Sequence, residues 1–132
     1  MTRLTIRIDF ADGTALGPGK VRLLELVAET GSIRKAAARM KMSYRRAWLL
    51  LKALDDMFGA PLIATATGGR EGGGASLSPL GHAVVERYRR VEQKASDLAT
   101  RDLRFLASSL ASRGKGRKSA PATLHSLKRK PA

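Results

Sequence analysis

Residues 31–59 read GSIRKAAARMKMSYRRAWLLLKALDDMFG, and this stretch decides the fold. Gly31 can end a preceding helix, and Ser32 can cap the next one, because a serine oxygen accepts a hydrogen bond from an unpaired first-turn N–H. Three consecutive alanines then favour a short helix and let another helix approach closely. The helical period breaks at Lys41, and Ser43 offers a second N-cap. The spacing predicts two crossed helices joined by a tight turn, which is a helix-turn-helix pattern.

The second helix of this pair has an apolar face and a basic face. Its apolar residues recur at helical spacing and are expected to face the core: Ala47, Leu50, Leu51, Leu54 and Phe58. Arginine presents a planar fork that suits guanine or phosphate, so we expect Arg45 and Arg46 to contact DNA. Ser43 and Tyr44 are expected to donate to phosphates, and Lys52 to reach the DNA backbone. The alternative is that these side chains only keep an exposed helix soluble.

Two further residues of the stretch carry specific expectations. Trp48 is the only tryptophan, and we place it beside the inward face, in core or helix packing rather than in base stacking. Lys41 occupies a turn position where the backbone often needs a positive φ, which favours glycine. We expect a lysine there to cost about 1 kcal/mol.

The sequence before this stretch predicts a hairpin followed by a helix. Residues 4–10, LTIRIDF, alternate apolar and polar side chains, as in a half-buried strand. Asp12-Gly13 is a turn signal, after which residues 14–16 can return as a short second strand. Gly17-Pro18 then opens a helix that stops at Gly31.

After the stretch, the sequence predicts a second hairpin. Residues 61–67, PLIATAT, read as a strand, the loop TGGREGGGA follows, and residues 75–77 can pair back. A strand, a loop and a strand directly after a recognition helix form a wing, which can reach an adjacent groove or the DNA backbone. Arg70 lies near its tip and is expected to make this contact. The loop lacks the GK[ST] signature of a phosphate-binding loop, so nucleotide binding is not expected.

Ser78-Pro79 then begins a helix that is expected to continue from about residue 82 to about residue 110. Apolar residues recur along it in alternating steps of three and four, as in a coiled-coil seam: Val84, Tyr88, Val91, Ala95, Leu98 and Phe105. We expect this helix to pair with its own copy in a homodimer. The alternative is that its first half packs on the domain and its second half is solvated.

Composition narrows the classes of partner. The chain of 132 residues has a net charge of +14, and residues 1–111 alone carry +7. Such a balance favours a polyanion such as nucleic acid. Cysteine is absent, which excludes disulfides and Cys-type zinc sites, and we expect neither a metal site nor enzyme activity. With no apparent signal peptide or transmembrane stretch, we expect a cytoplasmic, nucleoid-associated protein that has no membrane partner.

The segments LGPGKVRLLELVAETGSIRKAAARMKMSYRRAW, TGGREGGGA and LSPLGHAVVERY together carry a family resemblance. Over about residues 4–107 the sequence resembles the N-terminal domain of the molybdate-responsive ModE transcription regulators, relatives of the LysR-type winged helix-turn-helix proteins. The resemblance implies a dimeric DNA-binding protein that is joined through its long last helix and controls genes of molybdenum uptake or use. Known members continue into a molybdate-binding module, whereas residues 112–132 here are basic. We therefore expect no cofactor, with molybdate as the alternative ligand.

The expected fold class is mainly α with small β-sheets: a winged helix-turn-helix with a long C-terminal dimerisation helix. Residues 1–77 should form the DNA-binding domain with its N-terminal hairpin, residues 78–111 the dimerisation helix, and residues 112–132 a disordered basic tail. The expected function is that of a sequence-specific transcription regulator that binds an inverted repeat of double-stranded DNA as a homodimer. The alternatives are a molybdate-binding sensor or storage protein and a sequence-independent nucleoid architectural protein.

Overall fold

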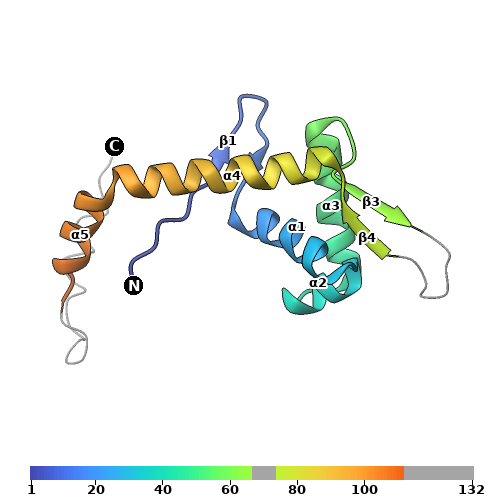
Figure 1. The fold of residues 1–132 in the computed structure, drawn as a ribbon, viewed down its shortest axis with the longest axis horizontal. Helices are drawn as coiled ribbons and strands as arrows, with labels where there is room; N and C mark the ends of the chain where they lie inside the picture. Colours follow the sequence, from blue (N-terminus) through green and yellow to red (C-terminus); the bar gives the residue numbers. More distant parts are fainter. Residues whose placement is uncertain (67–73, 112–132) are drawn as a thin grey trace. The chain divides into compact units, whose positions relative to one another are not determined.

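The computed structural model describes residues 1–66 and 74–111. Its described residues divide into two compact units, one formed by residues 4–66 and 74–96 and the other by residues 1–3 and 97–111. The first unit holds both small sheets, the first three helices and most of the fourth (Figure 1). The described residues are mainly helical, which confirms the expected fold class.

The N-terminal hairpin is shorter than the alternating pattern predicts. Strand β1 (Ile8–Asp9) pairs antiparallel with β2 (Ala15–Leu16), so the strand expected over residues 4–10 is wrong in its length. The reason is the partner strand, which must end before Pro18 begins helix α1 (Pro18–Thr30). That helix ends as predicted at Gly31, whose φ of 73° is left-handed.

The helix-turn-helix comprises α2 (Ile33–Arg39) and α3 (Tyr44–Phe58). Both predicted N-caps are confirmed, because the Oγ atoms of Ser32 and Ser43 accept hydrogen bonds at 3.0 Å from the amides of Lys35 and Arg46. Lys41 in the turn has a φ of 57°, so the expected positive φ is also confirmed. Helix α3 ends at Gly59, which again adopts a left-handed conformation.

The second hairpin follows α3 where the sequence places a wing. Strands β3 (Ile63–Ala66) and β4 (Gly74–Leu77) pair antiparallel, with Ile63 opposite Leu77. The amide of Ala75 donates a 2.9 Å hydrogen bond to the carbonyl oxygen of Gly31, which attaches β4 to the end of α1. Arg70 falls between the two strands and lies outside the described residues.

Helix α4 (Pro79–Leu98) begins at the predicted cap, where the amide of Gly81 donates to Ser78 Oγ at 3.0 Å. The single helix expected over about residues 82–110 is wrong. It is interrupted at Ala99, and α5 (Thr100–Ser108) follows. The hydroxyl of Thr100 donates to the carbonyl oxygen of Asp97 at 3.0 Å, a local bond that competes with the regular helical pattern.

The hydrophobic core lies in the unit of residues 4–96 and is built mainly by the first three helices. Its buried side chains are Leu16, Val21, Leu23, Leu24, Leu26, Val27, Ala36, Ala37, Ala47, Leu51, Leu54, Leu62, Leu77 and Tyr88. No polar or charged side chain is buried among the described residues. Since Ala36, Ala37 and Ala47 are all in the core, the small residues do sit where the helices of the helix-turn-helix meet.

Candidate nucleic-acid interface

Helix α3 divides into an inward and an outward face. Ala47, Leu51 and Leu54 are buried, as predicted, while Leu50 and Phe58 are half-buried. The predicted contact residues Arg45, Arg46 and Lys52 are all exposed. Helical spacing puts Arg45 and Lys52 opposite the buried side chains, with Arg46 at the edge of the outward face. The exposure of the three basic side chains agrees with the role expected for them.

Trp48 is not in the core. Its exposed fraction is 45%, and that of its neighbour Leu49 is 47%, so the expectation of core or helix packing is wrong for Trp48. The physical reason is that Ala47, Leu51 and Leu54 already occupy the inward positions. Residue 48 lies about 100° around the helix from residue 47, which turns it toward solvent.

A further cation, which the sequence did not single out, lies beside the start of α3. The guanidinium carbon of Arg34, in the first turn of α2, lies 4.6 Å from the ring centroid of Tyr44. This is a cation–π contact between the two helices of the helix-turn-helix. Tyr44 is exposed, and so is Ser43, whose oxygen is occupied as the cap of α3. The sequence signal for this contact was an arginine in the first turn of α2 together with a tyrosine at the start of α3, because a guanidinium group can lie over an aromatic ring.

The helix-turn-helix carries several cations and no acidic residue before Asp55, which lies near the end of α3. Between Glu29 and Asp55 the chain has no aspartate or glutamate, and its basic residues there are Arg34, Lys35, Arg39, Lys41, Arg45, Arg46 and Lys52. All seven are exposed. This surface favours a polyanion, because each cation that meets a phosphate releases a condensed counterion.

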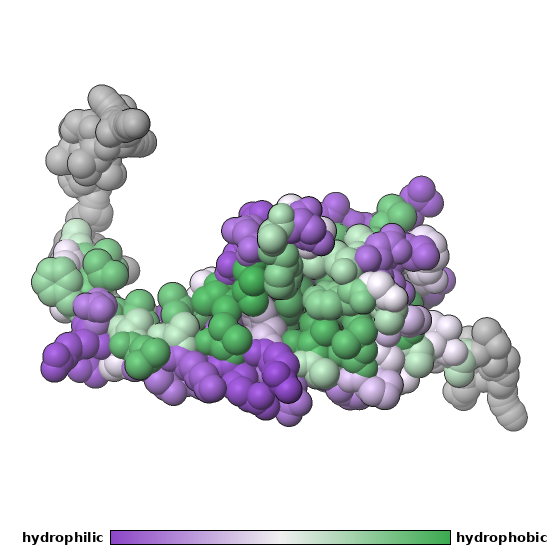
Figure 2. Space-filling view, turned by 90° about the horizontal axis from the view of Figure 1, so that it is seen from above, coloured by the Kyte–Doolittle hydropathy of each residue, from purple (hydrophilic) through white to green (hydrophobic). Residues whose placement is uncertain are grey.

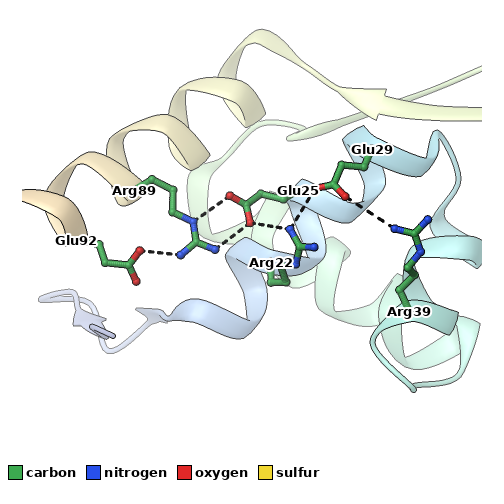
Figure 3. A network of polar contacts seen from close by, with 6 residues as sticks. All are labelled: Arg22, Glu25, Glu29, Arg39, Arg89 and Glu92. Carbon is green, nitrogen blue, oxygen red and sulfur yellow. Dashed lines mark hydrogen bonds and ion pairs between the residues drawn. The ribbon is translucent and has the colours of Figure 1, made fainter. Parts of the chain in front are cut away.

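A network of ion pairs joins helices α1, α2 and α4 (Figure 3). Glu25 of α1 accepts two hydrogen bonds of 2.9 Å from Arg89 of α4, and Arg89 also reaches Glu92 at 2.8 Å. Arg22 bonds both Glu25 and Glu29, and Arg39 of α2 lies 3.9 Å from Glu29. The network therefore ties α4 to the helix that packs beneath the helix-turn-helix.

The charges of this network reinforce one another. Hydrogen bonds from Arg89 lower the pKa of the Glu25 carboxyl below its ordinary value, against the opposing effect of burial. The same contact raises the pKa of the Arg89 guanidinium. Both groups are therefore fully charged near neutral pH, and the pair holds its two-bond geometry.

The predicted dimerisation residues of α4 occupy different environments. Val91 is 48% exposed, and Val84 and Ala95 are half-buried. Tyr88 is only 2% exposed: it belongs to the core of its own chain, and its hydroxyl donates to the carbonyl oxygen of Ile6 at 2.6 Å. The first part of α4 thus packs on the domain, in agreement with the alternative reading of this segment.

Beside α4 lies an apolar groove of about 300 Å³. Phe10 and Leu16 border it from the N-terminal hairpin, Phe58 from the end of α3, and Val84 and Val91 from α4. In Figure 2 hydrophobic side chains gather near the middle of the face shown, and hydrophilic ones border them. The groove leaves apolar surface of the domain open to solvent.

The remaining predicted dimerisation residues belong to the second unit. Leu98 and Phe105 are both strongly exposed, and no residue of α5 is buried. Phe105, Leu106 and Leu110 leave this unit with apolar surface of its own.

The described residues also limit other kinds of site. They contain no group of three or more histidine, cysteine, aspartate or glutamate side chains placed to hold a metal ion. Within the same ranges, no helix combines the length and the apolar character needed to cross a bilayer.

Comparison with known proteins identifies relatives of this domain. Residues 19–82 match the family described as bacterial regulatory helix-turn-helix protein, lysR family. The chain is 36% identical over 92 residues to the molybdenum transport protein ModE of Azotobacter vinelandii, covering 70% of this chain and 33% of that protein. It is 32% identical over 105 residues to the DNA-binding transcriptional dual regulator ModE of Escherichia coli, covering 75% of this chain and 38% of that protein. The chain thus spans about a third of the length of these relatives.

Solved structures agree with these matches. A CbnR DBD–DNA complex resembles the chain with a TM-score of 0.51 and 28% identity, covering 67% of this chain and 95% of that one. A BenM DBD/catB site DNA complex gives a TM-score of 0.52 at 17% identity, covering 72% of this chain and 97% of that one, a likeness of fold alone.

Proposed function

We propose that the protein is a DNA-binding transcription regulator of the lysR type, because residues 19–82 match the family described as bacterial regulatory helix-turn-helix protein, lysR family. One observation carries the proposal: the outward face of α3 presents Arg45, Arg46 and Lys52 within a stretch that has no acidic residue between Glu29 and Asp55. The likeness to a related domain in complex with DNA supports it.

In this proposal α3 lies in the major groove, and its N-terminal half contacts the base edges. Arg45 lies in the first turn of the helix and opposite its buried face, so it is the residue best placed for a base edge. Arg46 contacts a base or a phosphate from the edge of that face. Asp55 and Asp56 lie at the other end of α3, where their charges oppose phosphate contact. This asymmetry supports an approach by the start of the helix.

Phosphate contacts would flank the recognition helix. Ser43 and Tyr44 can donate from the start of α3, and Lys52 can reach the backbone from two turns further along. Arg34, stacked on the Tyr44 ring, adds a cation beside the same end of the helix. Arg70, which lies outside the described residues, remains our proposed contact from the wing.

We further propose that the protein acts as a homodimer, joined through the face of α4 that borders the apolar groove. The observation in favour is the exposure of apolar surface there, including Val91 and Phe10. A second copy would cover it, and a two-fold dimer would then bind an inverted repeat. Leu98 and Phe105 offer additional apolar surface to a partner, whereas Tyr88 would contribute through the core of its own chain.

The names of the ModE relatives refer to molybdenum transport and transcriptional regulation, so we propose that this protein regulates molybdenum-related genes. It would act in the cytoplasm, on the nucleoid. Isothermal calorimetry of the purified chain with molybdate tests whether molybdate itself is the signal. A stoichiometric heat of binding would support molybdate as the signal, and the absence of any heat would show that this chain does not bind it.

The direct test of DNA binding is a fluorescence anisotropy titration of labelled duplex DNA at several salt concentrations. The proposal predicts binding whose logarithmic affinity falls linearly with the logarithm of salt concentration, because phosphate contacts release counterions. A chain that leaves duplex DNA unbound at low salt contradicts it.

A further inference from the structure

The outward face of α3 also holds two large apolar side chains that the proposed DNA contacts do not use. Leu49 and Trp48, which we call the apolar pair, are exposed by 47% and 45%. The same helix gives its fully buried position 47 to an alanine. Helix α3 buries Leu51 and Leu54, as core packing favours, yet its largest apolar residue, Trp48, and the adjacent Leu49 are exposed.

The surroundings of the apolar pair indicate what kind of surface it meets. Leu49 lies one turn after Arg45 and one turn before Lys52, and Trp48 lies one turn before Lys52. Both cations are exposed on this side of the helix. An apolar partner protein or the interior of a lipid layer would have to desolvate these charges, which is costly. A DNA duplex would instead pair them with phosphates or base edges.

Only one kind of base edge in the major groove is apolar. Guanine, cytosine and adenine present donors and acceptors there, whereas thymine adds a 5-methyl group. We propose that the apolar pair contacts the 5-methyl groups of thymines, and that Leu49 and Trp48 thereby determine part of the sequence preference. This inference rests on the proposed function, and it names the chemical feature that the site would read.

The spacing along the helix sets where these thymines should lie. From Arg45 to Lys52 the helix rises by about 10 Å, at about 1.5 Å per residue. That length corresponds to about three base-pair steps of about 3.4 Å. A guanine facing Arg45 and a thymine facing Leu49 should therefore fall within about three base pairs of each other in each half-site.

The test compares thymine with deoxyuridine, which lacks only the 5-methyl group. Affinities are measured for a selected binding site and for the same duplex with its half-site thymines replaced, using the wild-type chain and Leu49→Ala. The affinity of the wild type should fall about fourfold for each contacted methyl group that is removed. This factor corresponds to about 0.8 kcal/mol per buried carbon. Leu49→Ala should bind the thymine duplex more weakly and should discriminate less between the two duplexes.

Two more variants separate this effect from other causes. Lys52→Ala is the matched control on the same face: it should weaken binding to both duplexes and leave their ratio unchanged. Trp48→Phe keeps an aromatic ring for packing while shortening the exposed side chain, and its ratio should fall between those of the wild type and Leu49→Ala. Circular dichroism spectra of all variants should match that of the wild type.

The outcomes distinguish this inference from the function on which it rests. Specific binding with equal affinity for the thymine and deoxyuridine duplexes overturns the thymine contact and leaves the regulator proposal standing. An unchanged ratio in both Leu49→Ala and Trp48→Phe overturns the assignment to the apolar pair. Absence of any sequence preference overturns both proposals together.

Discussion

The guanidinium of Arg89 in α4 donates two parallel hydrogen bonds of 2.9 Å to the carboxylate of Glu25 in α1. Parallel bonds of this kind fix direction as well as distance, because the planar fork of arginine matches the two carboxylate oxygens. Glu25 and Arg89 therefore hold α4 at a defined angle to α1 (Figure 3). If α4 joins two copies, this pair also helps to set the distance between their recognition helices.

Glu25→Gln should lower the free energy of unfolding by about 1–2 kcal/mol, because it replaces charge-assisted bonds that are partly shielded from water. The measurement is chemical denaturation at neutral pH and one fixed protein concentration. Glu86→Gln is the matched control: the side chain of Glu86 is 68% exposed and 3.7 Å from Arg90, so its loss should cost less than about 0.5 kcal/mol. If both substitutions lower the free energy of unfolding equally, the Glu25–Arg89 pair stabilises the fold no more than the exposed Glu86–Arg90 pair does.

The same pair predicts how stability depends on pH. The pKa of Glu25 is lowered in the folded chain from its ordinary value of 4.5, chiefly by the hydrogen bonds from Arg89. Its contribution is thus fully present above pH 4.5 and is lost as the pH falls through the lower folded pKa. The difference in stability between the wild type and Glu25→Gln should shrink when denaturation is repeated in increasingly acidic buffers. A difference that stays constant with pH would contradict this account.

Gly81→Ala should destabilise the fold by about 1–3 kcal/mol through a steric clash. A Cβ atom at Gly81 would overlap the carbonyl oxygen of Leu62, and a backbone atom there cannot move aside cheaply. Gly19→Ala is the control, because a Cβ at that helical position meets nothing within 4 Å. It should be neutral or stabilise by up to about 1 kcal/mol. Thermal unfolding of both variants checks the prediction, which fails if Gly81→Ala unfolds at the wild-type temperature.

Val91→Lys should shift the protein from dimer to monomer, because it places a charge on the apolar face of α4 that we propose as the interface. Sedimentation velocity over a range of concentrations measures the change. Glu86→Lys introduces the same side chain on the same helix outside the groove, and it should leave the dimer intact. A wild-type chain that sediments as a monomer at all concentrations would remove the proposed interface.

Arg45→Ala and Arg46→Ala should each weaken specific DNA binding by about 1–3 kcal/mol if their guanidinium groups read base edges. Arg90→Ala, on α4, serves as a control for the loss of one positive charge. Binding curves on a preferred and a scrambled duplex separate the possibilities. A loss confined to the preferred duplex assigns the residue to a base, and an equal loss on both assigns it to a phosphate.

Features that depend on a few consecutive residues could be predicted from the sequence. The caps at Ser32 and Ser43, the helix end at Gly31 and the positive φ of Lys41 all follow from local hydrogen bonding and backbone sterics. The wing strand β4 begins within one residue of its expected start. The exposure of the basic residues of α3 follows equally directly, since it depends only on helical periodicity.

Other features could not be predicted from the spacing of apolar residues. Tyr88 fits a seam by spacing, yet its hydroxyl bonds a carbonyl 82 residues away and its ring joins the core. Trp48 is hydrophobic enough for the core, but Ala47 and Leu51 already occupy the inward face of α3. The interruption at Ala99 lies beside the hydrogen bond from the Thr100 hydroxyl to the carbonyl oxygen of Asp97, which the seam pattern does not encode. Apolar spacing alone therefore predicted neither the burial of Tyr88 nor the break at Ala99.

The central claim, that α3 of a dimeric chain reads DNA sequence, is tested most directly by selection from a random duplex pool at near-physiological salt, followed by sequencing of the bound DNA. The account predicts enrichment of one inverted repeat, with half-sites spaced for two recognition helices on the same side of the duplex. Tight retention of DNA without any enriched sequence would contradict it, and would make the protein a binder of the DNA backbone instead.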